Sequence, residues 1–292
     1  MPSERVTLPV LFFIGILTMS FKANAQGLPL TSIWLTEIDD GIASELTLIS
    51  SAERYNNQPM FSLDGRTVYF TAEQTDGQTD IARFDVESRS LSLVNHSPES
   101  EYSPTPVPGL DVVSVIRVEL PDQLQRLWSI SVSSGEAKLL MPNVEPVGYQ
   151  SWLDSETVAV FILGDSFTLH KATVGDQPSQ LLATNVGRTL RKHPQTGHIL
   201  FVDKNSEPWS IASFDAENMV QTKVMDLFPG IEDFEVDSSG GYWMGSGSKL
   251  YRRAANESSW ALNADFQEFG IANITRLASS PDGDYLAIVG SR

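Results

Sequence analysis

The chain has 292 residues, of which 41% are hydrophobic and 20% are charged, values typical of a globular protein rather than a disordered one. Its formal net charge of −17 argues against binding to nucleic acid or to an anionic membrane surface, because both would repel it. Cysteine is absent, which excludes disulfides, thiolate metal sites and a cysteine nucleophile.

The first 25 residues are predicted to be a cleaved secretory signal peptide. Arg5 lies in a short polar start, the apolar run VTLPVLFFIGILTMSF follows, and Ala23-Asn24-Ala25 has the small-x-small form of a cleavage site. The alternative is an uncleaved membrane anchor, but the apolar run is shorter than the roughly 20 residues that cross a bilayer. We therefore expect a periplasmic or secreted protein, with no membrane insertion after cleavage.

Residues 26–292 are predicted to form a single domain of repeated β units. Four short β segments follow one another five times, joined by turns rich in Gly, Asn, Asp and Pro, with no amphipathic helical pattern between them. A period of roughly 40–47 residues is typical of propeller blades. The five whole units are expected at 54–97, 98–144, 145–186, 187–230 and 231–270.

A sixth unit is split between the two ends of the chain. Residues 271–292 supply its first two segments (NITRLASS and DYLAIVG), and residues 31–51 supply its third and fourth (TSIWLTEIDD and SELTLIS). Pairing of the two halves would close the ring with backbone hydrogen bonds and cover open sheet edges. The sequence therefore predicts an all-β fold, a six-bladed β-propeller of four-stranded antiparallel blades, closed by N-terminal strands that complete the C-terminal blade.

Two of the blades resemble the PD40, or WD40-like, repeat of TolB-like propellers. The matching positions are Pro59, Phe61, Ser62, Asp64, Gly65 and Arg66 in the first copy, and Ser280, Pro281, Asp282 and Gly283 in the last. Leu63 stands where the repeat has proline, and blades two to five lack its S-P-D-G core. The resemblance implies an architecture rather than a chemistry. TolB itself has a further N-terminal α/β domain, and we expect this propeller to stand without one.

Three short motifs suggest chemistry but are better explained as hairpin turns. Gly164–Ser166 (GDS) resembles the nucleophile block of GDSL hydrolases, but it lies between two β segments and no D-x-x-H occurs. Gly245–Lys249 (GSGSK) lacks the spacing and the strand–helix context of a phosphate loop. Thr75–Asp80 (TDGQTD) lacks the alternating acids and the final Glu of a calcium loop.

The candidate binding residues lie on the segments that lead into the first strand of each blade. The resemblance implies that these strands line the central axis, where propellers usually bind ligands or peptides. The candidates are Asn57, Glu101, Tyr102, Tyr149, Arg188, Arg191, Glu232, Asp233 and Arg276. Arginines and acids near one axis could bind a small polar ligand or a peptide terminus, with the tyrosines adding amphipathic contact. The alternative is that these charges pair across blades and only fill the funnel.

Two functions are compatible with this arrangement. The first is an exported, non-enzymatic and monomeric binding or scaffold module for a protein, peptide or glycan, with no cofactor, metal or catalytic residue. The second is a hydrolase- or lyase-like enzyme with an acidic central funnel that could hold a metal, which requires Glu101, Glu232 and Asp233 to converge. The four histidines, at positions 96, 170, 193 and 198, fall at dissimilar places in the blades and indicate no shared metal site, although two of them on one metal stays open.

Overall fold

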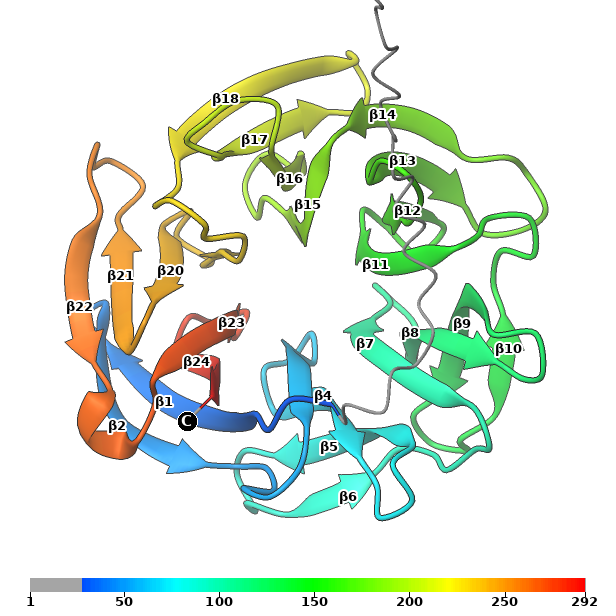
Figure 1. Cartoon of the computed structure of the whole chain (residues 1–292), viewed down its shortest axis with the longest axis horizontal. Coiled ribbons are helices and arrows are strands. Elements are labelled where there is room, and N and C mark those ends of the chain that lie inside the picture. Colours follow the sequence, from blue (N-terminus) through cyan, green and yellow to red (C-terminus); the bar gives the residue numbers. More distant parts are fainter. Residues whose placement is uncertain (1–27, 292) are drawn as a thin grey trace, which may run out of the picture.

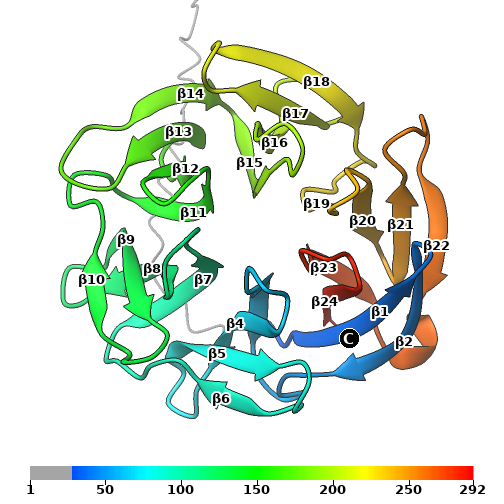
Figure 2. The same ribbon diagram turned by 180° about the vertical axis from the view of Figure 1, so that it is seen from behind.

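The computed structural model describes residues 28–291, which form six four-stranded antiparallel sheets arranged as a ring (Figure 1). The view from behind shows the same closed ring (Figure 2). The predicted all-β, six-bladed β-propeller is thereby confirmed. The predicted signal peptide, residues 1–25, lies outside the described residues. Within residues 28–291, no helix is long and apolar enough to cross a membrane.

Each blade is a meander whose first strand lies nearest the axis and whose fourth lies at the rim (Figure 1). Blade one consists of β3 (Asn56–Phe61), β4 (Thr67–Glu73), β5 (Thr79–Asp85) and β6 (Leu91–Leu93), and blade two of β7 (Ser100–Pro106), β8 (Val112–Glu119), β9 (Leu124–Ser131) and β10 (Ala137–Leu139). Blade three consists of β11 (Val147–Trp152), β12 (Thr157–Ile162), β13 (Thr168–Thr173) and β14 (Gln180–Thr184). Blade four consists of β15 (Val186–Lys192), β16 (Ile199–Asp203), β17 (Ser210–Asp215) and β18 (Val220–Asp226), and blade five of β19 (Glu235–Val236), β20 (Tyr242–Ser246), β21 (Lys249–Arg253) and β22 (Ala261–Asp265), followed by the short helix η1 (Gln267–Phe269). β15 begins one residue before the predicted start of blade four.

Blade six is assembled from both ends of the described chain, in the strand order β2-β1-β24-β23. Its strands are β1 (Ser32–Asp39), β2 (Ile42–Leu48), β23 (Asn273–Ser279) and β24 (Tyr285–Ser291). β1 and β24 pair antiparallel from Ser32↔Gly290 to Glu37↔Tyr285. The predicted closure by N-terminal strands is therefore confirmed, and backbone hydrogen bonds hold the ring shut.

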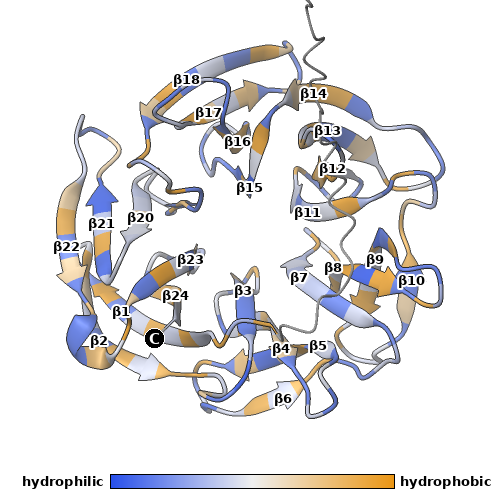
Figure 3. Ribbon diagram, in the orientation of Figure 1, coloured by the Kyte–Doolittle hydropathy of each residue, from blue (hydrophilic) through white to orange (hydrophobic). Residues whose placement is uncertain are grey.

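The hydrophobic core lies between neighbouring blades. The second strand of each blade is buried on both faces, which explains apolar runs such as TVYFTA in β4. Phe70 of β4, for example, belongs to one cluster with Ile33 and Ala287 of blade six. The rim strands are mostly exposed, and bands of hydrophobic and hydrophilic residues follow one another along them, as in β18 (Figure 3).

The two Asp-Gly segments form the same turn between the first and second strands of their blades. In blade one, Asp64 Oδ1 accepts hydrogen bonds from Ser62 Oγ (2.6 Å) and Arg66 N (3.1 Å), and Gly65 supplies the left-handed φ of 75° that the turn needs. Asp282 accepts the equivalent bonds in blade six. The bond from the Ser62 hydroxyl is the largest cause that lowers the pKa of Asp64.

Blades without the full motif keep this turn with other residues. Asp154 Oδ1 in blade three accepts bonds from the backbone N–H groups two and three residues later, at 2.8 and 2.7 Å. In blade four, His193 takes the place of the aspartate, and its Nδ1 accepts the same two bonds at 3.2 and 3.3 Å. The turn is thus common to blades whose sequences no longer resemble one another.

The three motif segments span turns in the structure. Gly164–Ser166 lies between β12 and β13, and Thr75–Asp80 joins β4 to β5. Gly245–Lys249 joins β20 to β21. Its first glycine also permits close approach of blades five and six, because a Cβ on Gly245 would lie 2.3 Å from Cγ2 of Ile274.

Candidate functional site

The innermost strands are irregular where they face the axis. Register shifts interrupt the pairing of β3, β7, β11, β15 and β23. Such bulges add residues on one strand and re-aim side chains. In β3 and β7 the extra residues include Gln58 and Ser103, with φ of 56° and 54°, a conformation that non-glycine residues rarely adopt. The bulges thus decide which side chains point at the axis.

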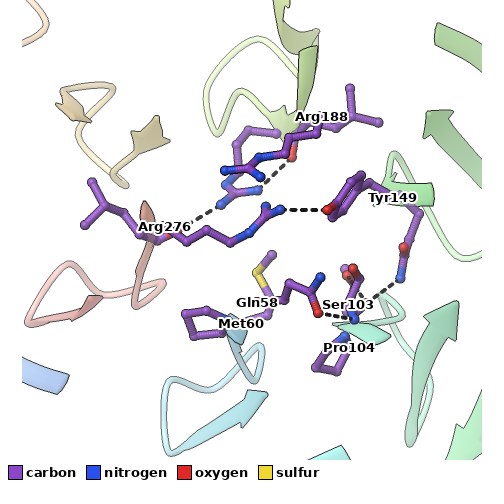
Figure 4. Close-up of a pocket in the computed structure, with 13 residues that line it drawn as sticks. Gln58, Met60, Ser103, Pro104, Tyr149, Arg188 and Arg276 are labelled. Carbon is purple, nitrogen blue, oxygen red and sulfur yellow. Dashed lines mark hydrogen bonds between the residues drawn. The ribbon is translucent and has the colours of Figure 1, made fainter. Parts of the chain in front are cut away.

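A narrow cavity of about 30 Å³ lies among these bulges, and we call it the axial neck (Figure 4). Three arginines from two blades line it, namely Arg188 and Arg191 of blade four and Arg276 of blade six. Five uncharged polar residues also line it, namely Gln58, Ser103, Thr105, Tyr149 and Gln150. None of the described residues that line the neck is acidic, although the chain carries a net charge of −17.

Hydrogen bonds between blades one, two and three fix one side of the neck. Gln58 Oε1 accepts bonds from the Thr71 hydroxyl (2.7 Å) and from the backbone N–H of Ser103 (3.1 Å). Because that N–H can only donate, it fixes the orientation of the Gln58 amide, whose Nε2 is then free of these bonds. Gln150 Nε2 donates to the carbonyl of Ser103 (2.7 Å), so the three blades are linked in sequence.

Arg191 is held by fixed partners on three elements. Its Nε donates to Glu235 Oε2 (2.7 Å), and its Nη1 and Nη2 donate to the carbonyl oxygens of Leu190 and Leu277 (both 2.9 Å). Burial raises the pKa of Glu235, whereas the charge of Arg191 opposes that shift. Such a buried pair with satisfied donors is a structural brace between blades four, five and six.

Arg276 is also largely engaged. Its guanidinium lies 4.7 Å from the centre of the Tyr149 ring, and Nη2 donates to the Tyr149 hydroxyl at 2.8 Å (Figure 4). Nη1 lies 3.7 Å from Asp233 Oδ1, an oxygen that accepts a bond from Thr189. The second oxygen of Asp233 accepts the backbone N–H of Leu277 (3.0 Å). Asp233 therefore joins blades four, five and six.

Arg188 differs from the other two arginines. Its backbone N–H donates to Glu232 Oε1 (2.9 Å), but that carboxylate is paired with Lys204 Nζ (2.8 Å) rather than with the Arg188 guanidinium. Within residues 28–291 the Arg188 side chain forms no hydrogen bond or ion pair, and its Nε is buried without a partner. Arg188 is thus an uncommitted cation in the neck.

A larger hollow of about 370 Å³ opens beside the neck, and we call it the axial funnel. All six blades contribute to its wall, and Met60, Thr105 and Arg191 line both neck and funnel, so the two are adjacent. The funnel wall is mainly apolar, with four prolines at positions 106, 108, 194 and 281. Among residues 28–291, Glu235 alone contributes a carboxylate to this wall, and it is paired with Arg191.

The predicted candidates fall into three groups. Tyr149, Arg188, Arg191 and Arg276 line the neck. Glu232 and Asp233 brace neighbouring blades, each 44 residues after the blade-four residue that it contacts. Asn57, Glu101 and Tyr102 are absent from the walls of both neck and funnel. Whether any of these residues binds a ligand stays a prediction.

Glu101 lies away from the axis, between blades one and two. It is fully buried, its Oε1 pairs with Arg117 Nη2 at 2.8 Å, and burial raises its pKa to about 7. The acids on which the enzyme hypothesis depends therefore do not converge. Among the described residues, no group of three or more His, Cys, Asp or Glu side chains is placed to hold a metal ion.

Sequence reasoning missed Gln58, Gln150, Glu235 and the prolines of the funnel. Gln58 directly follows the predicted Asn57, and Ser103 directly follows the predicted Tyr102. The bulges in β3 and β7 account for this offset of one residue. Equivalent positions of blades four and five are 44 residues apart, and this spacing would have predicted Glu235 as the partner of Arg191.

The fold and the axial cavities place this chain in the class of closed six-bladed β-propellers that have a hollow on their axis. No family model matches this chain. An uncharacterized protein of Agrobacterium fabrum (strain C58) is 35% identical over 81 residues, which are 28% of this chain and 26% of that protein.

Solved structures place the chain beside TolB-like propellers in fold. A structure assigned to TolB from Agrobacterium tumefaciens superposes with a TM-score of 0.71 at 13% identity, over 90% of this chain and 99% of that one. TolB from Acinetobacter baumannii gives 0.61 at 10% identity, over 90% of this chain and 63% of that one. Oligogalacturonate lyase from Vibrio parahaemolyticus gives 0.56 at 10% identity, over 89% and 96%. The TolB-like resemblance is confirmed as a fold, and this fold also occurs in an enzyme.

Proposed function

We propose that this chain is an exported, non-enzymatic and monomeric binding module that engages a protein or peptide partner through its axial funnel. The funnel carries the proposal, because a concave hollow of about 370 Å³ to which every blade contributes lies within the range of ligand-binding pockets. Its proline-rich wall favours a peptide over a glycan, since a glycan would need more polar partners than this wall offers. Export is supported by the N-terminal segment that ends in Ala23-Asn24-Ala25.

A plugging variant tests this function. Ser238 is exposed on the funnel wall, so Ser238→Trp would fill the funnel with an indole ring and leave the core untouched. Ser206→Trp is the matched control, because Ser206 is exposed in the loop between β16 and β17, at the opposite end of its blade from the first-to-second strand loops. Both variants should melt like the wild type.

The measurement is affinity capture from the cell envelope of the source organism with the immobilised mature chain. A partner retained by the wild type and by Ser206→Trp, but lost with Ser238→Trp, is the expected result. Equal capture by all three proteins would show that partners use another surface and would overturn the proposal. N-terminal sequencing of the exported protein tests cleavage after Ala25.

A further inference from the structure

The axial neck and funnel together select a particular kind of ligand. Their combined wall carries four cationic side chains, from Arg188, Arg191, Lys192 and Arg276, against one carboxylate, from Glu235. We propose that they bind the C-terminus of a polypeptide that ends in apolar residues, with the terminal carboxylate held by Arg188 in the neck. This inference rests on the proposed binding function and names its ligand.

Arg188 is the group that lacks a partner for its charge. Arg191 donates to three acceptors, and Arg276 is engaged by Tyr149 and Asp233. The Arg188 guanidinium has neither hydrogen bond nor carboxylate among the described residues. A planar guanidinium matches a carboxylate with two parallel hydrogen bonds, so an arriving anion would satisfy these donors.

Two other polar groups of the neck, the Tyr149 hydroxyl and the Gln58 amide, also favour an anion. The Tyr149 hydroxyl accepts a bond from Arg276, which leaves its own hydrogen to donate. Gln58 Oε1 is occupied by Thr71 and Ser103, so its Nε2 is the free end of the amide, and it points into the neck (Figure 4). Arg188, Tyr149 and Gln58 thus present hydrogen atoms that no described residue accepts.

The size of the neck distinguishes a carboxylate from larger anions. A buried space needs about 10–15 Å³ for one water-sized group, so about 30 Å³ accommodates two, which corresponds to the two oxygens of a carboxylate. A phosphate group, with its tetrahedral set of oxygens, needs more space than a carboxylate.

The funnel explains why the carboxylate should end a chain. The neck adjoins the funnel at Met60 and Thr105, which line both, and the apolar side chains of Leu63 and Trp152 belong to the funnel wall alone. An internal Asp or Glu would bring two flanking backbone segments, with their polar groups, against this apolar wall. A C-terminus brings one segment, whose last apolar side chains can pack on the prolines.

The test uses the mature chain, residues 26–292, and an array of synthetic hexapeptides whose last two positions vary among the apolar amino acids. The array is made once with free C-terminal carboxylates and once with C-terminal amides, and selected pairs are measured by fluorescence anisotropy. We expect apolar-ended acids to bind, and their amides to bind about tenfold to a hundredfold more weakly, as the loss of charge-assisted hydrogen bonds implies.

Two variants assign the effect to the neck. Arg188→Gln should lower the affinity for the acid to that for the amide without lowering the melting temperature, whereas Lys138→Gln, at an exposed position of the rim strand β10, should bind like the wild type. Equal binding of acids and amides, an Arg188→Gln variant that still prefers acids, or binding of octanoate but of no peptide would each overturn the inference. If Ser238→Trp abolishes partner capture while acids and amides bind equally, the binding function stands and the carboxylate inference alone fails.

Discussion

The buried carboxylate of Glu101 should make the stability of this protein depend on pH. Its Oε1 accepts bonds from Ser97 Oγ (2.6 Å) and Asn95 Nδ2 (3.3 Å) and pairs with Arg117, but its Oε2 is buried without a partner. Burial raises the pKa of Glu101 from 4.5 to about 7, even though Ser97 and Arg117 favour the charged form. The unfolded chain, by contrast, releases this proton at the ordinary value.

The sign of the effect follows from proton binding. Between the unfolded and the folded pKa, the folded protein holds a proton that the unfolded chain has lost, so the free energy of unfolding falls as the pH rises. For a change from 4.5 to about 7, the loss between pH 5 and pH 8 is about 2.5 kcal/mol. In a domain of this size it corresponds to a decrease of about 5 °C in melting temperature.

Glu101→Gln should remove this component, because an amide of similar size does not titrate. The assay is thermal unfolding, followed by circular dichroism from pH 5 to pH 8, of wild type, Glu101→Gln and Glu99→Gln. Glu99 is the matched control, since it approaches the same Arg117 at 4.0 Å with a partly exposed side chain. The hydrogen bond to Asp80 is the largest cause that raises the pKa of His96, which also favours the folded state at low pH. The charge of Glu101 adds a smaller part of that rise, so Glu101→Gln weakens this contribution as well, whereas Glu99→Gln leaves it in place. Melting temperatures of Glu101→Gln that run parallel to the wild type would refute the reasoning.

Three further predictions concern the closure and packing of the ring. Gly245→Ala should destabilise the protein by about 1–3 kcal/mol in chemical denaturation, because the new methyl group meets Ile274 of blade six; an unchanged midpoint would contradict that close approach. Asn56→Ala should lower the free energy of unfolding by about 2–3 kcal/mol in the same assay, because the Asn56 amide donates to three backbone carbonyls near the closure. Asn57→Ala should lower it by less than about 1 kcal/mol, and equal losses in the two variants would argue against a role of Asn56 in the closure. Deletion of residues 26–51 removes both N-terminal strands of blade six and should abolish cooperative thermal unfolding, and a melt like that of the intact chain would rule out closure by these strands.

The architecture was predictable because its signals are local and repeated. A second strand buried on both faces produces an apolar run in every blade, whatever happens to the turn before it. A search for the full turn motif would have revealed only two blades. Blade three keeps only its aspartate, Asp154, and blade four has His193 there, whose imidazole accepts the same backbone bonds. The unit split between the two ends of the chain then indicated six blades and the way the ring closes. Pairing of its two halves is the arrangement that covers the open sheet edge of each half.

The site was only partly predictable, because it depends on irregularity rather than on repetition. Counting along β3 and β7 led to Asn57 and Tyr102, but a bulge brings the next residue, Gln58 or Ser103, to the axis. A bulge has no consistent sequence signal, and its residues here have positive φ without being glycine. Composition was also misleading, since an overall charge of −17 says nothing about the sign of the charge in a single cavity.

Of the two expectations for the axial charges, mutual pairing is confirmed at Arg191 and Arg276, whereas binding stays our proposal for Arg188. Arg191 and Arg276 pair with acids of blade five and thereby hold three blades together, so their removal would leave buried carboxylates uncompensated. Arg188 lines the same neck, but no described acid pairs with its side chain. Its Nε is buried without a hydrogen bond, which lowers the stability of the folded protein. The Arg188 side chain adds nothing to the brace and lowers the stability of the free protein. Its presence is best explained by hydrogen bonds that it would make to a bound carboxylate. Loss of ligand binding without loss of stability is therefore the property that separates Arg188 from its two neighbours.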